Sequence, residues 1–118
     1  MKLYAFDVDE TLDIGKGPIG LAAIAELKSQ GHILGLCGNF AAVTGEIELR
    51  WDKYFSFLGP MGMTKAAFLS QLKHYVRCDE VVMVGNIFGI SGQSRDSEAA
   101  QEAGVRFIKE SDFAAGAR

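Results

Sequence analysis

The segment Lys2-Leu3-Tyr4-Ala5-Phe6-Asp7-Val8-Asp9-Glu10-Thr11-Leu12 decides the fold and indicates where the functional site lies. Its apolar first half is typical of a buried strand, and it ends in two carboxylates spaced two residues apart. Residues at this spacing share one face of a strand, so Asp7 and Asp9 can converge on one point at its frayed end. Gathered carboxylates need a cation or a proton to stabilise them. Such a pair can hold Mg²⁺, or one carboxylate can attack a substrate while the other transfers a proton.

Strand and helix signals alternate along the rest of the chain. The pattern predicts strands at 2–7, 33–37, 55–58, 81–85 and 105–108. It predicts helices at 18–30, 41–50, 64–76 and 96–104, with Pro18 in the first turn of the first helix, Gly31 as its stop, and Thr64 as the cap of the third. We therefore expect a single α/β domain over 1–118, a three-layer Rossmann-like fold with a mainly parallel central sheet of about five strands.

In such sheets ligands bind beyond the carboxyl ends of the strands. The polar and small residues that fall on this predicted edge are Asp7, Asp9, Cys37, Gly38, Asn39, Asn86 and the start of the helix that carries Lys65. The two cysteines, Cys37 and Cys78, fall on opposite edges of the sheet, too far apart for a disulfide, so we predict two free thiols.

Composition narrows the classes of partner. The 118 residues include 15 acidic and 12 basic side chains, a balance that argues against a nucleic-acid surface. No apolar run approaches the roughly 20 residues that span a bilayer, so we expect no membrane segment. The N-terminus enters a strand directly without a signal-peptide pattern, which makes a cytoplasmic location the expectation.

Taken in order, these residues resemble the haloacid dehalogenase superfamily of phosphohydrolases, and the resemblance covers the whole chain. The run from Phe6 to Leu12 looks like the first motif, Asp-x-Asp-x-Thr after a strand, and Leu36-Cys37-Gly38-Asn39 occupies the place of the second. Lys65, just inside a helix, matches the third motif. The apolar strand ending at Gly85, then Asn86 and the helix from Asp96 to Gly104, resemble the fourth.

The resemblance implies a mechanism. Asp7 would attack a phosphoryl group and form an aspartyl-phosphate, and Asp9 would act as general acid and then general base. Lys65 would hold the phosphate or the nucleophile, Thr11 would brace the loop around Asp7, and Mg²⁺ would be the cofactor. By the same resemblance the substrate-binding residues are Thr11, Cys37, Gly38, Asn39 and Lys65, and the metal ligands are Asp7, Asp9, Asn86 and Asp96.

Two departures from the family pattern favour a second interpretation. The second motif expects a hydroxyl, and this chain has Cys37 or Gly38 there; the fourth motif expects an acid where this chain has Asn86. Asp96 could compensate, although residues 87–95, which we interpret as an inserted loop over the site, separate it from Asn86. The alternative function is therefore a catalytically weak or inactive relative that binds a phosphorylated ligand or a protein partner.

Simpler interpretations of the single residues stay open at this point. Asp96 could be only a helix N-cap, Asn86 could shape a turn, and Lys65 could be a surface lysine. A phospho-acceptor receiver domain has a similar length and alternation, but its acceptor Asp should end the third strand, and Phe55-Ser56-Phe57-Leu58-Gly59 contains none.

Larger members of the family carry a cap domain after the first or second motif, and neither 13–36 nor 40–63 is long enough to hold one. The site is therefore expected to be open. We expect its substrate to be a phosphorylated small molecule or an accessible phosphate on a larger substrate. A neighbouring subunit of a homo-oligomer could instead cover the open site.

Overall fold

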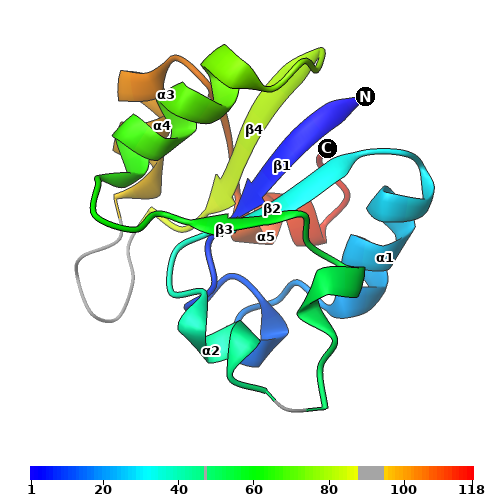
Figure 1. Cartoon of the computed structure of the whole chain (residues 1–118). Coiled ribbons are helices and arrows are strands. Elements are labelled where there is room, and N and C mark those ends of the chain that lie inside the picture. The colour runs from blue at the N-terminus through cyan, green and yellow to red at the C-terminus, as the bar shows by residue number, and fades with distance from the viewer. Residues whose placement is uncertain (47, 88–94) are drawn as a thin grey trace.

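The computed structural model describes residues 1–46, 48–87 and 95–118. Five parallel strands form one sheet in the order β3-β2-β1-β4-β5, with helices on both of its faces (Figure 1). The strands are β1 (Lys2–Phe6), β2 (Ile33–Cys37), β3 (Phe57–Gly59), β4 (Glu80–Gly85) and β5 (Arg106–Lys109). The α-helices are α1 (Leu21–Ser29), α2 (Ala41–Thr44), α3 (Lys65–Tyr75), α4 (Asp96–Ala103) and α5 (Glu110–Ala114). The predicted α/β fold class is confirmed.

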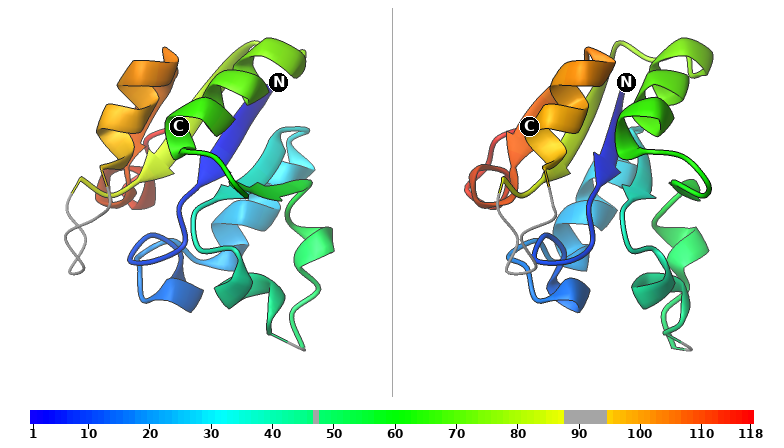
Figure 2. Two further views of the ribbon diagram at one scale, coloured as in Figure 1. Left: turned by 60° about the vertical axis from the view of Figure 1, so that its left-hand side comes forward. Right: turned by 90° about the vertical axis from the view of Figure 1, so that its left-hand side faces the viewer.

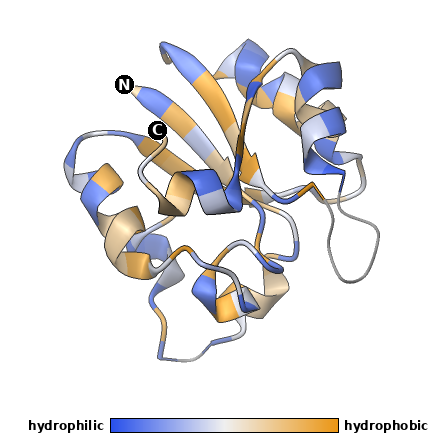
Figure 3. Ribbon diagram, turned by 180° about the vertical axis from the view of Figure 1, so that it is seen from behind, coloured by the Kyte–Doolittle hydropathy of each residue, from blue (hydrophilic) through white to orange (hydrophobic). Residues whose placement is uncertain are grey.

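Alternation along β1 divides the core into two layers. Tyr4 and Phe6 face a cluster that includes α1 and α5, whereas Leu3 and Ala5 face a cluster that includes α3 and α4. Figure 2 shows α3 and α4 together on one side of the sheet, with α1 on the other. Because both faces are covered, the central strands β1 and β4 are buried after their charged first residues, Lys2 and Glu80, whereas the helices mix hydrophobic and hydrophilic residues (Figure 3).

The ends of three neighbouring strands are level with one another. Phe6, the last residue of β1, pairs with Leu36 of β2 and with Val84 of β4. The ladder continues for one more bond, because the Asp7 N–H donates to the Val84 carbonyl at 2.9 Å. This register brings the residues that follow β1, β2 and β4 to one place on the carboxyl edge of the sheet.

The strand order also locates a topological switch point. The chain proceeds from β1 outward to β2 and β3, then returns to the other side of β1 for β4 and β5. Ligands in open α/β sheets bind at such a reversal, which here lies between the carboxyl ends of β1 and β4. Receiver domains have the flavodoxin-like order 2-1-3-4-5 instead, so the receiver interpretation is wrong for this chain.

Several predicted boundaries are corrected by local contacts. The first helix begins at Leu21 rather than at Pro18, because Ile19 is held in a bridge to Leu12. The helix predicted over 41–50 ends at Thr44, where the Gly45 N–H closes the last turn on Ala41; a 3₁₀ turn follows at 51–53. Strand β3 is shifted to Phe57–Gly59 from the predicted 55–58, because the Phe55 N–H closes the preceding turn on the Trp51 carbonyl.

Other local predictions are confirmed. The Thr64 hydroxyl accepts the Ala67 N–H at 3.1 Å, which is the N-cap bond expected at the start of α3. Gly31 and Gly104, the predicted stops of α1 and α4, both adopt positive φ (88° and 70°), the conformation that favours glycine there. Cys37 and Cys78 are both free thiols. Helix α5 had no counterpart in the sequence analysis; its Phe113 packs edge-on against Phe6.

Candidate functional site

Asp7 lies at the switch point, directly after β1. Its side chain is almost fully buried, with only 3% of the residue exposed. Gly38, which directly follows β2, leaves room for this carboxylate, because a β-carbon at position 38 would lie 2.2 Å from Asp7 Oδ1 and force it to move. The sheet thus packs the Asp7 carboxylate closely against the backbone of Gly38.

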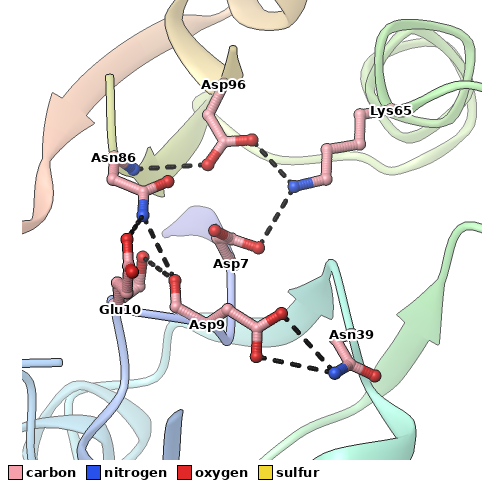
Figure 4. A network of polar contacts seen from close by, with 8 residues as sticks. Asp7, Asp9, Glu10, Asn39, Lys65, Asn86 and Asp96 are labelled. Carbon is pink, nitrogen blue, oxygen red and sulfur yellow. Dashed lines mark hydrogen bonds and ion pairs between the residues drawn. The ribbon is translucent and has the colours of Figure 1, made fainter. Parts of the chain in front are cut away.

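Lys65 bridges two buried carboxylates, as Figure 4 shows. Its Nζ donates to Asp7 Oδ1 at 3.1 Å and to Asp96 Oδ1 at 2.8 Å. The Thr64 cap fixes the beginning of α3 at Lys65, and the long aliphatic stem carries the ammonium from that helix to the strand edge. The interpretation of Lys65 as a surface lysine is therefore wrong.

Asp96 joins the site even though residues 87–95 separate it from Asn86. It is fully buried, and its Oδ2 accepts the Asn86 backbone N–H at 3.3 Å. Here too a glycine leaves room for the carboxylate, because a β-carbon on Gly85 would lie 2.2 Å from Asp96 Oδ2. Asp96 is the first residue of α4, Arg95 occupies the N-cap position, and no side chain caps the helix, so the interpretation of Asp96 as an N-cap is wrong.

Asn86 turns its side chain toward the end of β1. Its Nδ2 donates to the Asp9 carbonyl and to Glu10 Oε2, both at 3.3 Å. Only 3% of Asn86 is exposed, and its Oδ1 has no hydrogen-bond partner. In Figure 4 that oxygen points into the space bounded by Asp7, Asp9 and Asp96. A buried amide oxygen without a partner costs free energy, which an oxygen-seeking cation would recover.

The electrostatics favour a cation at the same place. Burial, with the nearby Asp96 carboxylate, raises the pKa of Asp7 to about 6, against the lowering effect of Lys65. Burial lowers the pKa of Lys65, but Asp7 and Asp96 outweigh it and raise that pKa overall. One ammonium therefore pairs with two buried carboxylates, and a bound cation would offset the remaining negative charge.

The residues present fit Mg²⁺ through mixed oxygen ligands. Within 1–46, 48–87 and 95–118, no three His, Cys, Asp or Glu side chains gather into a metal-binding group. The oxygens that face the site are the carboxylates of Asp7 and Asp96, the amide of Asn86 and the carbonyl of Asp9. Mg²⁺ commonly binds through one or two carboxylates and keeps several waters, so this set is sufficient in kind.

The exposed acid of the first motif lies apart from the buried one. Asp9 is exposed, and both of its carboxylate oxygens lie 3.5 Å from Asn39 Nδ2. Thr11 is fully buried, and its hydroxyl is 3.5 Å from the Asp9 carbonyl. This position suits the predicted bracing role of Thr11, whereas direct contact with a substrate would require it to be exposed.

The second motif does not supply the phosphate donor that sequence analysis sought. Cys37 is fully buried, and burial raises the pKa of its thiol to about 12. The backbone N–H of Gly38 donates to the Gly59 carbonyl at 2.9 Å, so it is already used in the sheet. Asn39, which is exposed at the rim, is the second-motif residue whose side chain reaches the site.

Sequence analysis missed Glu10, which lies beside Asn86. Glu10 adopts a positive φ of 59°, and this conformation, rare for a non-glycine residue, turns its carboxylate toward the fourth-motif residue. The sequence signal for this role was an acidic residue at the second variable position of Asp-x-Asp-x-Thr. Of the predicted loop 87–95, residues 88–94 lie outside the described residues.

None of the helices that the structure describes is both long and apolar enough to cross a membrane. Comparison of the chain with family models, with curated proteins and with solved structures finds no match to any of them.

Proposed function

We propose that this chain is a Mg²⁺-dependent phosphohydrolase of the haloacid dehalogenase type. One observation carries the proposal: Asp7, Lys65, Asp96 and Asn86, from four separate segments, meet at the switch point of the sheet. The meeting of these residues is what the resemblance in the motifs requires.

The buried and the exposed acid would take different parts. A carboxylate oxygen of Asp7 attacks phosphorus, the bond from phosphorus to the leaving oxygen breaks, and an aspartyl-phosphate forms. Exposed Asp9 donates its proton to the leaving oxygen, then takes a proton from the water that attacks the aspartyl-phosphate and releases phosphate. The position of Asp9 at the solvent edge supports this acid–base part.

Lys65 would hold Asp7 in place and offset the negative charge that gathers as the phosphate approaches. Asp7, Asn86, Asp96 and the Asp9 carbonyl would hold the Mg²⁺. When bound, the cation would screen the repulsion between the carboxylate and the phosphate dianion.

The test is hydrolysis of an aryl phosphate with and without Mg²⁺. The wild-type chain should release phosphate only with the metal, and Asp7→Asn should not. In Asp9→Asn, with an aryl leaving group that needs no acid, the aspartyl-phosphate should accumulate and show as one added phosphoryl group by mass spectrometry. Equal rates for wild type and Asp7→Asn would overturn the proposal.

A second candidate is a non-catalytic domain that binds a phosphorylated ligand. It is favoured by the second motif, where the Cys37 thiol is buried and the Gly38 N–H is committed to Gly59. Saturable binding of a phosphate ester without turnover, abolished in Lys65→Met, would support this function over hydrolysis.

A further inference from the structure

Asn86 is a neutral residue at the position where the resembled family has an acid, and its amide has two ends with opposite properties. The oxygen can bind a cation, whereas the NH₂ group can only repel one. Whether Asn86 serves a metal site therefore depends on which end of the amide faces the carboxylates.

The contacts of Asn86 fix that orientation. Its Nδ2 lies 3.3 Å from the Asp9 carbonyl and 3.3 Å from Glu10 Oε2. Ionised Glu10 only accepts hydrogen bonds, as does the carbonyl. If the amide were reversed, Oδ1 would face both acceptors and no donor would remain between them. The observed orientation leaves Oδ1 buried, without a partner, and directed toward Asp7 and Asp96 (Figure 4).

Glu10 reaches Asn86 only through an uncommon backbone conformation. Its φ is 59°, a region that costs free energy for residues other than glycine. The turn is held by the Glu10 N–H, which donates to the Gly15 carbonyl at 2.7 Å. Glycine would adopt this conformation without that backbone cost.

We infer that Glu10 is a positioning residue for the cation site: it orients the Asn86 amide so that Oδ1 faces the metal, and it supplies the negative charge that Asn86 lacks. The inference rests on the proposed function, because it concerns the same Mg²⁺ site. On this account the negative charge that the resembled family has at position 86 is supplied here by Glu10, from the neighbouring segment.

The experiment is a double-variant cycle read by Mg²⁺ titration calorimetry. Glu10→Gly should weaken Mg²⁺ binding by about 10-fold or more, the usual effect of removing a residue that orients a ligand. The same change should raise the melting temperature of the metal-free protein, because glycine accepts a positive φ. A loss of affinity in a more stable protein cannot result from misfolding. Glu26→Gln, an exposed helix position with the same change in charge, is the control and should bind Mg²⁺ as wild type does.

The second background completes the cycle. In Asn86→Asp both ends of the side chain are oxygens, so no orienting partner is required, and Glu10→Gly should then cost little affinity. Equal losses in both backgrounds, or no loss in the wild-type background, would overturn the role of Glu10 while leaving the proposed function intact. Absence of Mg²⁺ binding by the wild-type chain would instead overturn the metal dependence itself, and the role of Glu10 with it.

Discussion

Lys65 and Asp96 form a 2.8 Å ion pair that joins the first residue of α3 to the first residue of α4. The same ammonium lies 3.1 Å from Asp7, so three segments of the chain meet at one nitrogen atom. Because two buried carboxylates share one positive charge, the stability of the site should depend on pH and on added cations.

Replacing Lys65 by Met should destabilise the protein by about 3 kcal/mol at pH 8, because two carboxylates would remain buried without their cation. The loss should be smaller at pH 5, where Asp7, whose pKa is raised to about 6, takes up a proton. Urea denaturation at the two pH values measures both effects. Lys53→Met, at an exposed position, is the matched control; a loss for Lys65→Met no larger than for this control would contradict the prediction.

Replacing Asp7 by Asn should stabilise the metal-free protein at pH 8. The folded pKa of Asp7, about 6, exceeds the ordinary value of 3.8, so the folded state holds this proton more tightly than the unfolded state does. The wild type therefore loses stability as the pH rises from about 4 to above 6, by at most about 3 kcal/mol at roughly 1.4 kcal/mol per pKa unit.

In Asp7→Asn that pH dependence should be absent, and Mg²⁺ should raise the melting temperature of the wild type alone. Thermal unfolding across this pH range, with and without the metal, checks both statements. A variant less stable than wild type at pH 8 would show that the Lys65 pair outweighs the burial of the Asp7 charge.

Restoring a hydroxyl to the second motif should harm the site. A β-carbon at position 38 would lie 2.2 Å from Asp7 Oδ1, so Gly38→Ser should displace that carboxylate from Lys65 and lower both stability and the proposed phosphatase activity. Gly20→Ser provides the contrast, because its nearest neighbour would be 3.6 Å away and it occupies the N-cap of α1. Serine there should stabilise the protein by a few tenths of a kcal/mol. Higher activity in Gly38→Ser would contradict the steric account.

The two thiols should differ in reactivity. Cys37 is fully buried and its pKa is raised to about 12, so it stays a neutral thiol at pH 8, whereas Cys78 is partly exposed. Iodoacetamide should modify Cys78 in the native protein and both cysteines after unfolding, as peptide mass spectrometry would show. Rapid native modification of Cys37 would mean that the β2 end opens readily.

The parts of the site that could be predicted are those that follow directly from strand ends. Asp7 and Asn86 each come immediately after an apolar run, so parallel strands had to bring them to one edge. Lys65 was predictable because Thr64 marks the start of its helix. These inferences need only local patterns and the rule that carboxyl ends of parallel strands share an edge.

The remainder depends on contacts that spacing does not reveal. Asp96 enters the site because Gly85 leaves room for its carboxylate, which requires knowing how α4 packs on β4. The Gly38 N–H is unavailable because β3 pairs with β2, and the short β3 gave only a weak signal. The side chain of Glu10 reaches Asn86 because the residue adopts a positive φ, a conformation that a glutamate in the sequence does not predict.

The two carboxylates that meet at Lys65 are far from it along the chain: Asp7 precedes Lys65 by 58 positions, and Asp96 follows it by 31. During synthesis on a ribosome, Asp7 and Lys65 emerge well before the carboxylate that completes the trio. The nascent polypeptide should consequently complete this ion-paired cluster only after α4 has emerged, and any fragment stopped ahead of α4 should lack it.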